Sequence, residues 1–72
     1  MSVGAEIKRL REEAGLTQDG LSRVVCTSRT AIAQFERGYK LPSLAMLCRI
    51  ADALGTTPAA ILEAGTAKEV KS

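Results

Sequence analysis

The chain has 72 residues, of which 46% are apolar and 25% are charged, and its formal net charge at pH 7 is +2. This length suffices for one small domain that buries about 60% of the surface of its unfolded chain, and the aliphatic-rich composition excludes a disordered protein. The longest strictly apolar run, Leu44–Cys48, is far too short to cross a bilayer, and the polar N-terminus shows no signal peptide, so we expect a cytoplasmic protein with no membrane partner.

The order of apolar, glycine and capping residues predicts five helices. They lie over about residues 3–14, 18–25, 29–37, 44–54 and 58–62. Four of them follow a residue that can cap a helix: Thr17, Ser28, Ser43 and Thr57. No segment shows the pattern of a strand, so the expected fold class is all-α, a compact five-helix domain. We expect this domain to span residues 1–64 and a polar C-terminal tail to follow over residues 65–72.

The two cysteines, Cys26 and Cys48, stand far apart in a chain that has no histidine. This is not the spacing of a metal site, so no metal and no other cofactor is expected. We interpret both thiols as reduced, small core residues of a cytoplasmic protein.

The third predicted helix has two chemically different sides. At about 100° per residue, its apolar side holds Ala31, Ile32 and Phe35. Its polar side holds a separate set: Arg29, Thr30, Ala33, Gln34 and Arg37. A guanidinium, a hydroxyl and an amide in one stripe are groups that read base edges in the major groove of DNA. Residues 23–40 also carry four basic side chains against one carboxylate, a local charge of +3.

Features of an enzyme are missing from the sequence. There is no histidine, no glycine-rich phosphate loop and no nucleophile with a plausible base. The adjacent Glu12 and Glu13 are interpreted as part of a solvated helix face and not as a catalytic carboxylate pair. The sequence therefore predicts a binding module.

Five segments carry a resemblance when they are taken in order: IKRLREEAGLTQ (7–18), LS (21–22), TSRTAIAQFERG (27–38), LPSL (41–44) and RIADALG (49–55). Together they resemble the helix-turn-helix domain of phage repressor and Cro proteins, the XRE family, over about residues 6–63. The resemblance implies a lambda-repressor-like fold, usually dimeric, that represses or activates transcription at a two-fold symmetric operator. Two residues depart from the family. Gly20 stands where a larger residue is preferred. Cys26 replaces the usual glycine of the turn, so either Cys26 takes a positive φ or the turn differs slightly.

Four residues of the third helix are predicted to read bases. Arg29 is the candidate for a bidentate contact to guanine, and Gln34 can pair with adenine through its amide. Thr30 would bond a base or a phosphate, or touch a thymine methyl group. Ala33 would allow close approach or contact a methyl group itself.

Six further residues are expected to bind DNA phosphates: Gln18, Ser28, Arg37, Gly38, Tyr39 and Lys40. The resemblance implies that the Gln18 amide grips the DNA backbone. Gly38, Tyr39 and Lys40 would offer a backbone N–H, a hydroxyl and an ammonium. The resemblance also implies that Arg11 pairs with Glu36, which would neutralise the one carboxylate of the third helix.

The sequence predicts a regulator of transcription, a repressor that binds a palindromic operator in double-stranded DNA as a homodimer. The apolar residues of the fifth helix, Ala59, Ile61 and Leu62, are the expected dimer interface. We expect no separate effector domain and no small-molecule ligand, because the chain is too short to hold a second domain. Two alternatives stay open: an antitoxin-type autoregulator that also binds a toxin, and a protein-interaction module that has lost DNA binding.

Overall fold

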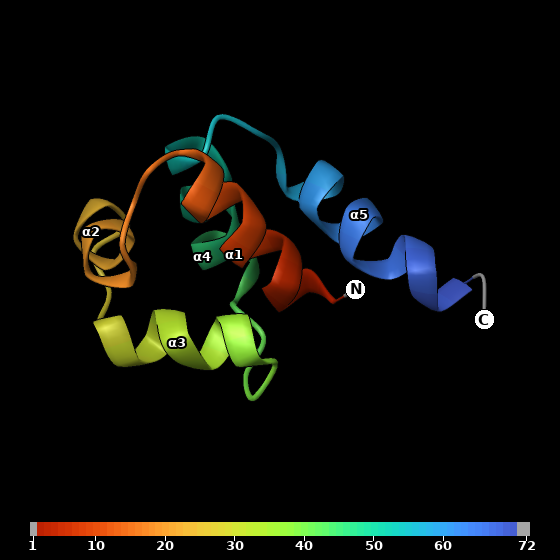
Figure 1. The fold of residues 1–72 in the computed structure, drawn as a ribbon, viewed down its shortest axis with the longest axis horizontal. Helices are drawn as coiled ribbons and strands as arrows, with labels where there is room; N and C mark the ends of the chain where they lie inside the picture. Colours follow the sequence, from red (N-terminus) through yellow and green to blue (C-terminus); the bar gives the residue numbers. More distant parts are fainter. Residues whose placement is uncertain (1, 71–72) are drawn as a thin grey trace.

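The computed structural model describes the chain from residue 2 to residue 70, with side chains through residue 65. Its helices are α1 (Val3–Glu13), α2 (Gln18–Val24), α3 (Arg29–Arg37), α4 (Leu44–Ala53) and α5 (Pro58–Val70) (Figure 1). No strand occurs within these described residues. The predicted all-α, five-helix fold is therefore confirmed.

Capping side chains set the helix starts. The hydroxyls of Thr17, Ser28 and Ser43 each accept the backbone N–H three residues later, at 2.9, 3.0 and 3.1 Å. Thr57 does the same for the N–H of Ala60 at 3.1 Å. Each bond satisfies a donor that the first turn of a helix leaves without an intrahelical partner. All four predicted caps are thus confirmed.

Helix α5 is longer than the sequence predicted. The expected end near Leu62 is wrong, because α5 continues to Val70. Gly65, expected to begin a polar tail, is a buried residue of this helix, and a Cβ on it would lie 2.7 Å from the Cα of Val3. The missing side chain lets α5 approach α1 closely. The rest of the expected tail, residues 66–72, lies outside the side chains that the structure describes.

The core is aliphatic and receives side chains from every helix. Its buried members are Ile7, Leu21, Val25, Ile32, Phe35, Leu47, Ile50, Ala51 and Ile61. Leu44 would extend the apolar stripe of α4, but it is 71% exposed. Leu44 is the first residue of α4, and the core begins one turn further along the helix.

Both cysteines are exposed free thiols, so the prediction that they are core residues is wrong. Cys26 lies in the turn between α2 and α3, directly after the buried Val25 and outside the helical periodicity of α2. Its φ is +60°, so of the two possibilities for this turn, the positive φ is the one adopted. Cys48 follows the core residue Leu47 on α4 but lies on the solvent side of that helix.

Two features fasten α1 to α3. The first is the ion pair that the resemblance implied: Arg11 Nε donates to Glu36 Oε2 at 2.6 Å, and Arg11 Nη2 donates to Oε1 at 3.2 Å. The two side chains are only 9% and 3% exposed. The second is Gly4, where a Cβ would lie 2.1 Å from the Phe35 carbonyl oxygen. The helices therefore meet backbone to backbone at one point and through a shielded charge pair at another.

A second buried carboxylate, Glu6, is held within α1. It accepts two hydrogen bonds from Arg9, at 2.9 Å from Nε and 2.7 Å from Nη2. These bonds hold the pKa of Glu6 below its ordinary value of 4.5, against the opposing effect of burial. Arg9 also reaches Glu13 at 2.8 Å, which makes a short charged ladder along the helix.

Within the described residues, no single helix is long and apolar enough to cross a membrane. Helix α4 and the first part of α5, through Gly65, reach the necessary length and composition only when they are joined, and they are bent by 99° relative to each other.

Removal of the buried carboxylate of Glu36 is expected to destabilise the fold. In Glu36→Ala the Arg11 guanidinium loses its partner in a shielded position, so we expect the free energy of unfolding to fall by about 3 kcal/mol. Urea denaturation followed by far-UV circular dichroism measures this. Glu13→Ala is the matched control, because the Glu13 side chain is 66% exposed. Equal unfolding free energies for the two variants would contradict the prediction.

The contribution of Glu6 to stability is expected to depend on pH. Because its pKa is lowered in the folded chain, its ionised form stabilises the fold above pH 4.5, and this contribution is lost as the pH falls through the lower folded value. The difference in Tm between wild type and Glu6→Gln should therefore be full at neutral pH and shrink in acid. Thermal melts across this range test it, with the exposed Glu12→Gln as control. A difference that stays constant with pH would refute the assignment.

Candidate nucleic-acid interface

Helices α2 and α3 form the helix-turn-helix that the sequence predicted. The turn between them is closed by the Thr27 N–H, which donates to the Ser22 carbonyl oxygen at 2.8 Å. Ser22 itself is buried, and its hydroxyl donates to the Asp19 carbonyl oxygen at 2.7 Å. Ile32 and Phe35 fix the inner side of α3 in the core. These contacts decide which side of α3 faces outward.

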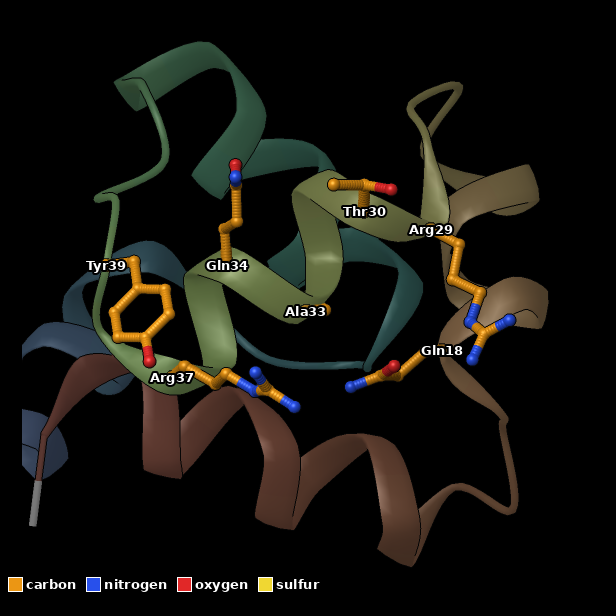
Figure 2. A pocket seen from close by; sticks show the side chains of 7 residues that line it. All are labelled: Gln18, Arg29, Thr30, Ala33, Gln34, Arg37 and Tyr39. Carbon is orange, nitrogen blue, oxygen red and sulfur yellow. The ribbon is translucent and has the colours of Figure 1, made fainter.

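The outer side of α3 carries the five residues expected there. Arg29, Thr30 and Arg37 are exposed, and Ala33 and Gln34 are half-buried. With two residues of neighbouring segments they line one open hollow of about 420 Å³ (Figure 2). Its lining residues are Gln18, Arg29, Thr30, Ala33, Gln34, Arg37 and Tyr39. The tertiary structure therefore brings all four predicted base-reading residues together on one surface.

The charged side chains that line this hollow are both cationic. Arg29 and Arg37 lie at opposite ends of α3, and their guanidinium groups approach the Gln18 side chain from its two sides (Figure 2). The carboxylate of the same helix, Glu36, is turned inward and paired with Arg11. The nearby acid on α2, Asp19, is paired with Arg23 at 3.0 Å. The outer side of α3 thus offers cationic and polar groups without an opposing carboxylate.

The structure places the six predicted phosphate-binding residues in different situations, and only Gln18, Arg37 and Tyr39 line the hollow. Arg37 and Tyr39 line the hollow, and Tyr39 is 76% exposed. Lys40 is exposed beyond the end of α3. Ser28 caps α3 with its hydroxyl oxygen, which leaves the hydroxyl hydrogen available to an acceptor.

One predicted contact does not fit the geometry. Gly38 was expected to offer its backbone N–H to a phosphate, but this N–H donates to the Phe35 carbonyl oxygen at 3.2 Å. Gly38 takes φ +80° as the left-handed residue that ends α3, and this cap geometry turns its N–H back toward the helix. Its role is to end the helix, and the expectation of a free donor is corrected.

Gln18 has a partner that the sequence did not reveal. Its Nε2 donates to Glu36 Oε1 at 3.0 Å, across the gap between α2 and α3. Residues 18 and 36 lie on different helices, and no local pattern relates them. The sequence signal was limited to an amide at the start of α2 and a carboxylate on α3 for which the resemblance implied Arg11 as the partner.

The expected dimer interface on α5 is corrected in part. Ile61 is completely buried within the single chain, because it fills the core between α5 and the other helices, so it offers no surface to a second copy. Ala59 and Leu62 are exposed, Leu62 by 43%. Leu62 and the 75% exposed Leu41 border a second hollow of about 360 Å³.

Metal ligands do not cluster in the described part of the chain, where no group of three His, Cys, Asp or Glu side chains lies close enough to hold an ion.

Comparison with known proteins identifies this arrangement. The model of the helix-turn-helix family HTH_3 matches residues 7–61. An immunity repressor protein of Bacillus phage phi105 is 42% identical over 62 residues, which are 86% of this chain and 43% of the phage protein. An uncharacterized HTH-type transcriptional regulator of Methanothermobacter thermautotrophicus is 45% identical over 49 residues, 68% of this chain and 71% of that protein. This chain thus spans less than half the length of the phage repressor that it matches.

Solved structures show the same fold. The P22 c2 repressor, crystallised in complex with the synthetic operator 9T, superposes with a TM-score of 0.84 at 28% identity, covering 88% of this chain and 96% of that chain. The clp gene regulator ClgR from Corynebacterium glutamicum superposes with a TM-score of 0.86 at 27% identity, covering 92% and 70%. The chain therefore belongs to the helix-turn-helix family of the phage-repressor type, the XRE family, which is a family of DNA-binding transcriptional regulators.

Proposed function

We propose that this protein is a sequence-specific repressor of transcription that binds a palindromic operator as a homodimer. The observation that carries the proposal is the outer side of α3, where seven residues with hydrogen-bonding, cationic or small side chains surround one open hollow. The inner side of the same helix is committed to the core. The P22 c2 repressor, which shares this fold, was crystallised with an operator.

The size of α3 suits the major groove of DNA. An α-helix with its side chains is about 10–12 Å across, and the groove is about 12 Å wide, so α3 can enter it. Arg29, in the first turn, has a fork of donors that matches guanine, and the Gln34 amide matches adenine. Thr30 and the small Ala33 lie between them and permit close approach to base edges. These four residues are the proposed base-reading set.

The residues around this set are proposed to bind DNA phosphates. Arg37, Tyr39 and Lys40 follow one another from the last turn of α3 into the next loop, where a strand of DNA would pass. Gln18 and the hydroxyl hydrogen of Ser28 lie at the other end. Such contacts fix the register of the helix in the groove and carry little sequence information.

A dimer is proposed because one α3 spans too few base pairs for a specific site. Two copies related by a two-fold axis would place their α3 helices about 34 Å apart, in successive major grooves. The proposed contact consists of Leu62 and Leu41, which border the second hollow, and of the exposed Ala59, which precedes Leu62 by three residues on α5. Its hollow is also lined by Gly38, the residue that ends α3, so this contact adjoins the proposed DNA-binding surface.

Two substitutions should separate base reading from phosphate binding. Arg29→Ala is expected to weaken binding to the selected operator by about 1–3 kcal/mol and to relax preference at one base position. Lys40→Ala is expected to weaken binding to all sequences similarly and to lower the salt slope of log K by about one. Selection of bound fragments from random DNA, then titrations at several salt concentrations, measures both. Equal losses on specific and random DNA for both variants would exclude these roles.

The proposed dimer surface is tested by Leu62→Asp. A charge on this exposed residue should weaken self-association and operator binding together while far-UV circular dichroism stays unchanged. Val24→Asp is the matched control, because Val24 is also apolar and 59% exposed but lies on α2, across the molecule from α5 (Figure 1). Sedimentation equilibrium gives the association constant. A wild-type chain that stays monomeric at tens of micromolar would eliminate this interface.

A further inference from the structure

Three helices meet at the carboxylate of Glu36. Arg11 from α1 donates to both of its oxygens, at 2.6 and 3.2 Å, and Gln18 from α2 donates to Oε1 at 3.0 Å. Arg11 also donates from Nη1 to the carbonyl oxygen of Leu16, at 2.6 Å, just before α2 begins. Among the described residues, every buried side-chain nitrogen or oxygen atom has a hydrogen-bond partner. The start of α2 is therefore tied to α1 and α3 by both its backbone and its first side chain.

The partner of Gln18 decides which way its amide points. A carboxylate only accepts hydrogen bonds, so the Gln18 NH₂ group must face Glu36 and its carbonyl oxygen must face away. One N–H and the oxygen then remain for a ligand at the outer hollow, which Gln18 lines together with Arg29 and Arg37 (Figure 2). The side chain has already lost the rotamer freedom that a free glutamine would lose on binding.

The charge of Glu36 is suited to this role only because Arg11 neutralises it. An unpaired carboxylate under a DNA-binding surface would repel phosphates. Here the guanidinium donates to both carboxylate oxygens, and the Glu36 side chain is 3% exposed. The neutral Gln18 amide bonds Glu36 of this pair and also lines the outer hollow, so it is the group that connects the two.

We propose that Glu36 is a positioning residue for DNA binding, which presets the Gln18 amide for a phosphate of the DNA backbone. This inference rests on the proposed function and adds a residue that does not itself touch the DNA. It predicts that Gln18 contributes to DNA affinity only while the Glu36 carboxylate holds it.

The first test is the side-chain amide spectrum of the free protein. The chain has no asparagine and only two glutamines, Gln18 and Gln34, so the spectrum contains two NH₂ pairs. We expect the Gln18 pair to show high order parameters and one proton shifted downfield by the carboxylate, and both features to be lost in Glu36→Ala, which has no acceptor at this position. Gln34 is the internal reference. A Gln18 pair that is as mobile in wild type as the Gln34 pair would overturn the proposal.

The second test is a double-mutant cycle on DNA binding. At a temperature where circular dichroism shows every variant folded, Gln18→Ala should weaken binding to a selected DNA fragment about tenfold in the wild-type background. In the Glu36→Ala background, which lacks the acceptor, the same change should cost less than about threefold. In Glu13→Ala, which removes an exposed carboxylate of α1, the tenfold loss should persist. Equal losses in all three backgrounds would overturn this inference alone. Absence of DNA binding by the wild type would overturn the proposed function and this inference with it.

Discussion

A carboxylate on a helix that approaches DNA is unfavourable unless its charge is neutralised and turned away from the phosphates. Glu36 meets both conditions through its pair with Arg11, whose guanidinium lies between α1 and α3. The pair is bidentate and nearly shielded from water, so each charge depends on the other. Helix α3 therefore takes its orientation relative to α1 from this contact as well as from the apolar core.

The orientation of α3 in turn determines what the molecule can bind. Ile32 and Phe35 occupy the core, so Arg29, Gln34 and Arg37 have only the outer side available. In this nine-residue helix, the residues on the inner side therefore stabilise the fold, and those on the outer side are available for recognition. A change on the inner side acts through folding, whereas a change on the outer side leaves the core intact.

Two glycines allow the backbones of neighbouring helices to approach each other closely. Gly4 brings α1 against the carbonyl groups at the end of α3, and Gly65 brings α5 against the start of α1. In both places a Cβ would collide with backbone atoms, so even alanine would force the helices apart. Helix α5 thereby buries Ile61 inside the chain and leaves Leu62 at the surface. This division is the reason that only part of the predicted interface on α5 remains available to a second copy.

The sequence by itself determined the features that depend on neighbouring residues. The caps at Thr17, Ser28, Ser43 and Thr57 and the two-sided pattern of residues 28–37 are local, since a helix start needs only the next three residues and a helix face repeats every three or four. The outer residues of α3 were therefore predictable as a set. Only the tertiary structure decided that Gln18 bonds Glu36, that Ile61 is buried, that Cys26 and Cys48 are exposed and that α5 continues through Gly65. Each of these depends on which segments lie side by side in space, and burial and pairing between distant segments leave no local pattern in the chain.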